Sequence, residues 1–293
     1  MIASVPSNHA DGVAYYHSFG LSENYIIFLE SPIKMVFKNR LKNAVLNKPT
    51  LDAFETDQNF PTYIHIINQH TGEVLKQKFK TDAQFTFHHM NAYEEVKSDD
   101  LTNLIVDVCS FDTKHFNLHN LTYKNINEGH LQLSDKSKSL ARRIEVPIKK
   151  SAKPDEEIYC EIKDINDYAF EFPTINYDYN TKPYKYVYGT NSIYSTPFTV
   201  CKLDVQTGEM IKVKYAEEGI NVTPSEAIFV PNPDGTSEDD GVLLVMVLSD
   251  KNDYLSVLDA KDLTEIGRAD LPNEVKSTFT FHGFFADKAK MFA

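Results

Sequence analysis

A recurring strand-turn-strand pattern is the feature that most constrains the fold of this 293-residue chain. A strand-like segment ends on Asn or Asp, passes through Thr-Gly-Glu or a similar turn, and is followed by a second strand-like segment. The pattern occurs at residues 63–73, 200–209 and 255–268. Asn, Asp and Gly in these positions are typical of hairpin turns. Repeated hairpins predict an all-β chain built from β-propeller blades, and a β-sandwich is the competing interpretation.

Further segments rich in Val, Ile, Tyr and Leu, each bounded by turn residues, predict strands. They lie at residues 25–29, 63–67, 104–108, 184–188, 242–248 and 254–258. The 19 Phe and 16 Tyr of the chain strengthen this prediction, because aromatic residues favour strands. No domain boundary is visible in the sequence, so a single domain over residues 1–293 is expected.

Two regions lack the strand pattern. Residues 34–47 place apolar side chains among Lys and Arg at helical spacing, which predicts a basic amphipathic helix. Such a helix either packs on the sheets or lies on a membrane surface. Residues 125–153 are polar and charged with little periodicity, and they are expected to form a long connection between strands.

The composition excludes some classes of function. The formal net charge of -12 argues against nucleic-acid binding, which needs a basic surface. The three cysteines lack metal-ligand or disulfide spacing, so reduced thiols in a cytosolic protein are expected. The N-terminal residues lack the pattern of a secretory signal, and the apolar run at residues 242–248 is too short to span a bilayer. A cytoplasmic location is therefore expected.

Three of the ten histidines directly follow an aromatic residue in a strand-like segment: His17, His88 and His282. An imidazole among aromatic side chains needs a partner for its nitrogens, and either a metal ion or an ordinary hydrogen bond would serve. The sequence contains no HExxH, GxSxG, P-loop or GxGxxG motif. A metal bound here would therefore have scattered histidines as its main ligands, and the inner strands of separate propeller blades could bring them together.

Six segments carry a more specific signal. The chain reads YYHSFG and ENY within 15–25, FHHMNAYEE at 87–95, EFPTINY at 171–177, SEAIFVP and EDDGV within 225–242, LDAK and EIGRA within 258–269, and FHGFF at 281–285. These segments resemble, in order, the motifs of the carotenoid cleavage oxygenases of animals, the family of the beta-carotene oxygenases and the retinal pigment epithelium isomerohydrolase. The resemblance runs from about residue 2 to residue 285 and covers the C-terminal part of those proteins.

The resemblance implies a seven-bladed β-propeller with short helical cap segments. It also implies iron(II), Fe(2+), held by four histidines without a carboxylate ligand. Three of these ligands map onto His17, His88 and His282. In the double-histidine motif, His88 is preferred over His89 because relatives often keep only the first histidine of the pair.

Further residues acquire a role through the same resemblance. Glu171 and Glu226 match positions whose carboxylates hydrogen-bond the ligand histidines and fix their orientation. Without the resemblance, both residues would be interpreted as surface carboxylates at strand edges. Tyr15 and Phe281 are candidates for the wall of an apolar substrate tunnel, and each could equally belong to the core of the propeller.

The implied activity is an oxidative cleavage. O2 would be inserted across a double bond of a carotenoid or apocarotenoid to give two aldehydes or ketones, a reaction of retinoid metabolism. A retinyl ester isomerohydrolase of the same family shares these motifs and is an alternative. A non-catalytic protein that binds carotenoids or lipids is a second alternative.

An apolar substrate dissolves in membranes, so the protein is expected to contact a bilayer peripherally. The expected contact residues are Val36, Phe37, Leu41, Val45 and Leu46. The family's first iron ligand lies upstream of the HSFG motif, and the chain is therefore expected to lack N-terminal blades and one ligand. A propeller without these blades would leave open sheet edges, so the isolated chain is expected to fold poorly or to aggregate.

Overall fold

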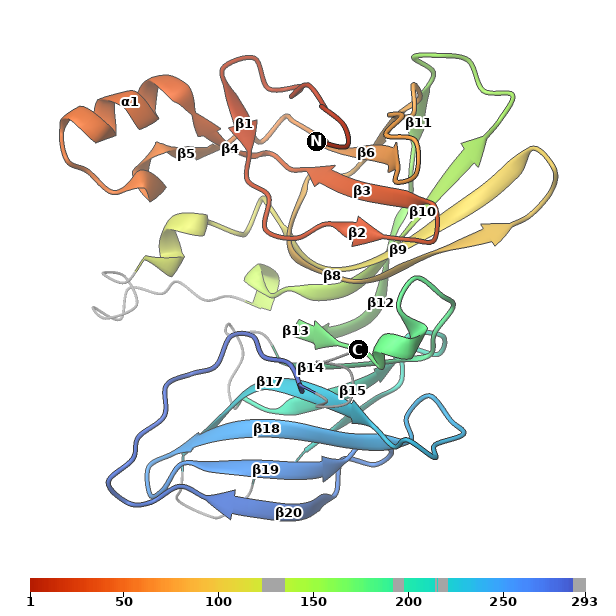
Figure 1. Cartoon of the computed structure of the whole chain (residues 1–293). Helices are drawn as coiled ribbons and strands as arrows, with labels where there is room; N and C mark the ends of the chain where they lie inside the picture. Colours follow the sequence, from red (N-terminus) through yellow and green to blue (C-terminus); the bar gives the residue numbers. More distant parts are fainter. Residues whose placement is uncertain (123–134, 192–197, 214, 216–220, 287–293) are drawn as a thin grey trace. The chain divides into compact units, whose positions relative to one another are not determined.

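The computed structural model describes residues 1–122, 135–191, 198–213, 215 and 221–286. Strands make up most of its regular structure, which confirms the all-β prediction (Figure 1). Each of the six segments predicted to be strands overlaps a strand of the structure. The chain divides into two compact units, Met1–Asp164 and Ile165–Ala293.

The first unit, over its described residues, contains three sheets (Figure 1). The smallest consists of β1 (Gly12–Ala14), β4 (Ile33–Val36) and β5 (Phe54–Thr56) in the order β1-β4-β5. The second has the order β11-β7-β6-β3-β2 and consists of β2 (Gly20–Leu21), β3 (Tyr25–Glu30), β6 (Thr62–Asn68), β7 (Lys78–Thr81) and β11 (Glu157–Tyr159). The third has the order β12-β10-β9-β8 and consists of β8 (Gln84–Val96), β9 (Leu101–Asp112), β10 (Leu140–Lys149) and β12 (Ile162–Ala169), which continues into the second unit.

The two larger sheets of the first unit share one hydrophobic core. Val106 and Val108 of β9 point to the same face, because side chains alternate along a strand. They pack in one cluster with Ile64 of β6 and Phe79 of β7 in the neighbouring sheet. All four side chains are buried. This shared core fixes the position of β8, which carries His88.

The second unit, over its described residues, contains two four-stranded sheets whose strands follow one another in sequence order (Figure 1). One consists of β13 (Glu171–Thr174), β14 (Tyr186–Thr190), β15 (Val200–Asp204) and β16 (Met210–Lys212). The other consists of β17 (Val222–Pro231), β18 (Gly241–Ser249), β19 (Tyr254–Asp259) and β20 (Glu265–Asp270). Such antiparallel up-and-down sheets of four strands are typical of propeller blades. Side chains of both sheets, including Tyr188 and Leu243, form one core.

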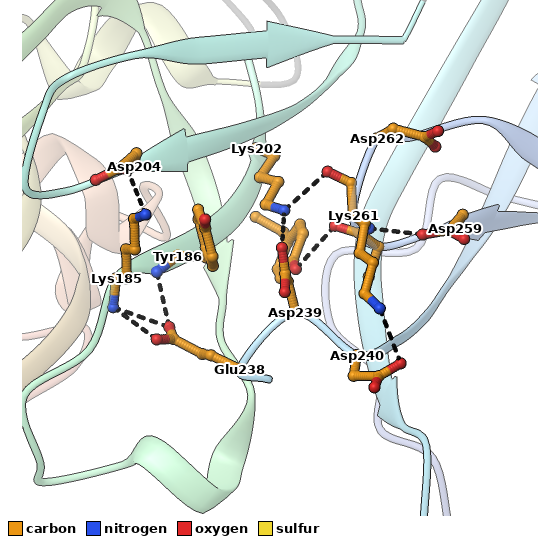
Figure 2. A network of polar contacts seen from close by, with 12 residues as sticks. Lys185, Tyr186, Lys202, Asp204, Glu238, Asp239, Asp240, Asp259, Lys261 and Asp262 are labelled. Carbon is orange, nitrogen blue, oxygen red and sulfur yellow. Dashed lines mark hydrogen bonds and ion pairs between the residues drawn. The ribbon is translucent and has the colours of Figure 1, made fainter. Parts of the chain in front are cut away.

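A polar network also joins the two sheets of the second unit (Figure 2). The buried ammonium of Lys202 lies 2.6 Å from Asp239 Oδ2 and donates to the carbonyl of Lys261 at 2.9 Å. The same charge lies 4.0 Å from the ring centre of Tyr186, within the range of a cation–π contact. The Glu238 carboxylate accepts the backbone N–H of Tyr186 at 2.7 Å. These contacts attach the loop before β18 to strands β14 and β15.

The recurring turn has the structure that its sequence predicts. Asn68 Oδ1 accepts hydrogen bonds from two backbone N–H groups of its own turn, and Asp204 Oδ1 does the same in the later repeat. The glycines that follow, Gly72 and Gly208, have φ angles of 74° and 76°, in the left-handed region that favours glycine. The two turns therefore have the same hydrogen bonds and the same glycine backbone conformation.

The predicted helix is confirmed in part. α1 spans Phe37–Val45, whereas residues 34–36 belong to β4. The expectation that Val36 lies on a membrane-facing surface is wrong, because the pairing of β4 with β1 turns this side chain inward and buries it completely. Within the described ranges, no helix has both the length and the hydropathy needed to cross a bilayer.

The expected connection over residues 125–153 is wrong for its second half. Residues 125–134 lie outside the described residues, but β10 occupies Leu140–Lys149 and pairs with β9 over its whole length. Apolar residues at alternate positions of β10 are buried in the core of the first unit. On the opposite face, Arg143 forms a bidentate contact with Asp107, at 2.8 and 2.7 Å. The charged residues of β10 hide, in the sequence, the alternation of buried and exposed positions that is typical of a strand.

Candidate metal centre

His17 lies in the connection between β1 and β2 of the first unit. Its Nδ1 is 3.1 Å from the hydroxyl oxygen of Tyr15. The ring of Phe87 stands edge-on to the imidazole, with 5.1 Å between the ring centres. A histidine that is held through Nδ1 presents Nε2 as its ligand atom, so these two contacts orient His17 as a metal ligand is oriented.

His88 lies at an irregular part of β8. The β8–β9 register skips one residue of β8 between Thr86 and His88, which marks a β-bulge, and His88 lies opposite Cys109. The ring centres of His88 and His17 are 5.1 Å apart with their planes perpendicular. One nitrogen of each ring lies within 4.8 Å of the other. The structure therefore brings together the two candidate ligands of the first unit.

His89, the second histidine of the pair, faces the other side of the sheet. It lies opposite Val108, whose side chain belongs to the core. Its Nδ1 is 2.8 Å from Ser18 Oγ, and this hydroxyl donates its one proton to the carbonyl of Phe87. The hydrogen-bond pattern therefore assigns the proton of the His89 ring to Nδ1. Burial, with a smaller effect of His88, lowers the pKa of His89 to about 3, so this ring is neutral at pH 7.

His282 lies in the second unit, in the segment that follows β20. Its Nδ1 is 3.0 Å from Glu226 Oε1, and the N–H of Gly283 donates to Glu226 Oε2 at 3.0 Å. Glu226 is buried and comes from an irregular part of β17, where the pairing with β18 shifts between Pro224 and Ala227. A carboxylate acceptor places the proton on Nδ1 of His282 and leaves Nε2 as the nitrogen suited to a metal.

Glu171 and Phe172 begin β13 of the second unit. The buried Glu171 carboxylate accepts the backbone N–H of Phe172 at 2.9 Å. Phe172 has a φ angle of 53°, which strains a bulky residue, and such strain is concentrated at functional sites. Its ring centre lies 5.9 Å from that of Phe281 and 6.1 Å from that of His282. Phe281 itself is 61% exposed.

Aromatic side chains of the first unit form a continuous group beside His17 and His88. This group, the aromatic wall, consists of Tyr15, Phe85, Phe87, Phe111 and Phe116. Neighbouring ring centres are 4.4 to 5.7 Å apart. Phe85, Phe111 and Phe116 are buried, whereas Tyr15 and Phe87 are partly exposed and lie next to the histidines. Of these residues, only Tyr15 was predicted from the sequence, although the alternation of Phe85 and Phe87 before His88 was a signal for these two.

The donor set of the site consists of imidazoles. Neutral imidazole is a common ligand of iron, zinc and copper, and ligand histidines usually hydrogen-bond an oxygen partner through their other nitrogen. His17 and His282 both show this arrangement, with Tyr15 and Glu226 as the partners. Each of these histidines is therefore suited to bind a transition-metal ion such as iron(II).

Comparison with known proteins relates this site to a family. The sequence matches the family model of the retinal pigment epithelial membrane protein over residues 2–287. It is 32% identical to the beta,beta-carotene 15,15'-dioxygenase of Gallus gallus, with 97% of this chain and 56% of that protein covered. Its identity to the Homo sapiens protein of the same name is also 32%, with 97% and 54% covered. The chain thus spans about half the length of these curated relatives.

A solved structure shows the same fold. A variant of the apocarotenoid oxygenase of Synechocystis matches with a TM-score of 0.71 at 23% identity, and the match covers 92% of this chain and 53% of that chain. The family match and the shared fold confirm the resemblance that the six sequence segments carry. The chain belongs to the retinal pigment epithelial membrane protein family, which is the family of the carotenoid cleavage oxygenases.

Proposed function

We propose that this chain is part of an iron(II)-dependent dioxygenase that cleaves a double bond of a carotenoid or apocarotenoid to two aldehydes or ketones. The observation that carries the proposal is the pair His17 and His88, whose nitrogens lie within 4.8 Å of each other beside the aromatic wall. The reaction is supported by the names of the relatives from Gallus gallus and Homo sapiens.

His17, His88 and His282 are the proposed iron ligands of this chain. Bound iron(II) would supply the activation of O2 at the coordination positions that the histidines leave open. Glu226 would keep the proton of His282 on Nδ1, and the contact that supports this role is 3.0 Å long. Glu171 is proposed to hold a ligand histidine in the same way, a role supported by its burial.

The residues around the histidines suit an apolar substrate. Tyr15 and Phe87, the partly exposed rings of the aromatic wall, can pack along a polyene and keep water from it, and the buried rings behind them hold them in place. The Tyr15 hydroxyl orients His17 while the Tyr15 ring belongs to the wall. Phe281 and Phe172 are proposed to contact the substrate from the second unit, because the Phe172 ring lies 6.1 Å from the His282 ring and 5.9 Å from the Phe281 ring.

The proposed architecture is a single seven-bladed propeller domain to which residues 1–293 contribute. The four-stranded antiparallel sheets β13–β16 and β17–β20 support this architecture, because each has the strand order of a blade. α1 is proposed to be part of the helical cap.

We also propose a peripheral contact with a membrane. Phe37, Leu41, Val45 and Leu46 are 54%, 70%, 78% and 53% exposed. The first three recur every four residues on one side of α1, among several Lys and Arg, as in helices that lie on membrane surfaces. A cytoplasmic location is proposed as well, and it is supported by Cys109, Cys160 and Cys201, which are buried and form no disulfide with one another.

Metal analysis tests the proposed iron site. Iron per protein is measured for the wild-type chain and for His88→Ala and His282→Ala. We expect both variants to bind less iron per protein than the wild type. His70→Ala is the matched control, because His70 is exposed on a turn and should not affect iron. Retention of iron by His88→Ala would contradict the ligand assignment.

Product analysis tests the reaction. The iron-loaded protein is incubated with β-carotene and O2, and the products and the O2 consumed are measured. Aldehyde products with O2 consumption are expected. An alcohol formed from a retinyl ester without O2 consumption would indicate the isomerohydrolase reaction instead. A chain that binds iron but converts neither substrate would be a binding protein.

A further inference from the structure

A group of enclosed polar atoms lies in the first unit, apart from the proposed ligands. None of these atoms has a hydrogen-bond partner among the residues that the structure describes. The group consists of Thr81 Oγ1, Gln84 Nε2 and Oε1, Thr86 Oγ1, His89 Nε2 and Ser110 Oγ. Enclosed polar atoms in proteins are almost always hydrogen-bonded, because an unpaired one has lost its hydration without compensation. These atoms therefore indicate a bound polar ligand.

The strand registers bring these side chains together. Thr86 of β8 lies directly opposite Ser110 of β9, so both point to the same face. Gln84 lies two residues before Thr86 and shares that face. The hydroxyl of Thr62 donates to the carbonyl of Gln84 and accepts its N–H, and Thr62 is paired with Thr81 across β6 and β7. The polar atoms thus lie where the third sheet of the first unit meets the second.

The same face continues to His89. The bulge in β8 places His89 opposite Val108, which is two residues from Ser110 on β9. A Cβ atom on Gly20 of β2 would come within 3.1 Å of His89 Cδ2, so β2 covers this ring from the second sheet. The polar face is therefore enclosed between two sheets, at one end of their shared apolar core.

The other end of the polar face opens to solvent. Thr81 and Gln84 contribute to the lining of a surface pocket of about 670 Å³. The pocket is also lined by charged and polar residues, among them Lys80, Asp82, Arg142 and Tyr159. A polar lining of this kind holds water, and Thr81 and Gln84 belong both to the pocket and to the enclosed group.

We infer that these atoms bind a file of ordered water molecules. It runs from the surface pocket, between the two sheets, to His89 behind the proposed ligand His88. The Gln84 amide both donates and accepts hydrogen bonds, the hydroxyls do the same, and His89 Nε2 accepts. A set of neutral donors and acceptors matches water, whereas an enclosed ion would need charged partners. The file gives solvent a polar route to the back of the site that does not cross the aromatic wall.

Water relaxation measurements test the inference. Magnetic relaxation dispersion of ¹⁷O and ²H counts long-lived internal waters in solution, and the difference between variants is the quantity of interest. The double variant Thr86→Val, Ser110→Ala removes the two opposed hydroxyls of the polar face. We expect it to lose the signal of about one water or more, since an internal water makes about three hydrogen bonds. Its unfolding equilibrium constant should rise about fivefold or more in urea, because the remaining atoms lose partners.

Thr174→Val is the matched control. The Thr174 hydroxyl donates to the carbonyl of Ala227 at 2.7 Å in the second unit, so its removal should lower stability but leave the water signal unchanged. An unchanged water signal in the double variant, together with higher stability, would show that the polar face is dry and would overturn the inference. If the double variant does not fold, Gln84→Met gives the same two readings. Neither result depends on iron, so this experiment can contradict the inference without contradicting the proposed function.

Discussion

Glu226 Oε1 lies 3.0 Å from Nδ1 of His282, so a buried carboxylate determines which nitrogen of this half-exposed histidine carries a proton. Glu226→Gln keeps the shape of the side chain and removes its charge. We expect the affinity for iron to fall about 10- to 100-fold, the usual effect of losing such a partner. Titration against a competing chelator measures the affinity. Glu209→Gln changes an exposed carboxylate of the same unit and should have no effect.

The lowered pKa of Glu30 predicts that the folded protein loses stability in acid. Burial would raise its pKa, but hydrogen bonds from His65, Ser7 and Asn8 outweigh burial and lower the pKa from 4.5 to about 2. The folded pKa is below the unfolded one, so this group stabilises the fold above about pH 4.5. The stabilisation, on the order of 3 kcal/mol, is lost as the pH falls from 4.5 toward 2.

Urea unfolding between pH 7 and pH 2.5 measures this contribution. The free energy of unfolding of the wild type should fall steeply below pH 4.5, and that of Glu30→Gln should fall less. The control Glu157→Gln removes an exposed carboxylate and should keep the steep fall. Parallel pH profiles for Glu30→Gln and the wild type would refute the assignment.

Gly20 is predicted to be intolerant of a side chain. A Cβ atom there would lie 3.1 Å from His89 Cδ2 and 3.3 Å from Ile27 Cβ, so Gly20→Ala should cost about 1–3 kcal/mol through overpacking. At Gly267 the nearest atom would be 3.7 Å away, an ordinary contact. Gly267→Ala should therefore change the free energy of unfolding by less than about 0.5 kcal/mol. Equal effects of the two substitutions would show that β2 does not press on His89.

Arg143 and Arg142 are neighbours on β10 with different expected effects. Arg143→Met removes the bidentate partner of the fully buried Asp107 and should cost about 3–5 kcal/mol. Arg142 contacts Asp164, whose side chain is 54% exposed, so Arg142→Met should cost less than about 1 kcal/mol. Chemical denaturation of both variants measures the difference. A small cost for Arg143→Met would indicate that Asp107 has sufficient other partners.

The exposed apolar residues of α1 predict membrane binding. Phe37→Glu and Leu41→Glu place charges on the exposed side of α1 and should reduce the fraction of protein that floats with liposomes. Ile266→Glu, which changes an exposed apolar residue of β20, is the matched control and should float like the wild type. Unchanged flotation of both α1 variants would exclude this helix as the contact.

Local signals in the sequence account for most of what could be predicted of the fold. Short apolar segments and Asx turns such as that at Asn68 depend on neighbouring residues alone, and these predictions are confirmed. β10 could not be predicted, because it carries the charged Arg143. The partner of this side chain, Asp107, lies 36 residues away in the sequence. Such a pairing is visible only once the register of β9 and β10 is known.

In the candidate site, too, the features that depend on local sequence could be predicted and those that depend on the surrounding structure could not. His17, His88 and His282 follow from motifs in the sequence. The orientation of His88 and His89 does not, because simple alternation from Thr86 would put His88 on the core side and the bulge at residue 87 reverses this. The strained backbone of Phe172 likewise has no signal in the sequence, since its φ angle depends on the surrounding structure.

The buried ammonium of Lys202 affects how the second unit opens. This charge, held by Asp239 in the loop before β18, comes from the sheet that contains β14 and β15 (Figure 2). Pulling the sheets apart would separate a buried ion pair and uncover their common core at the same time. Opening one sheet alone is therefore costly, and slow amide protons of β14 and β18 should exchange in a single cooperative event, as one foldon rather than two.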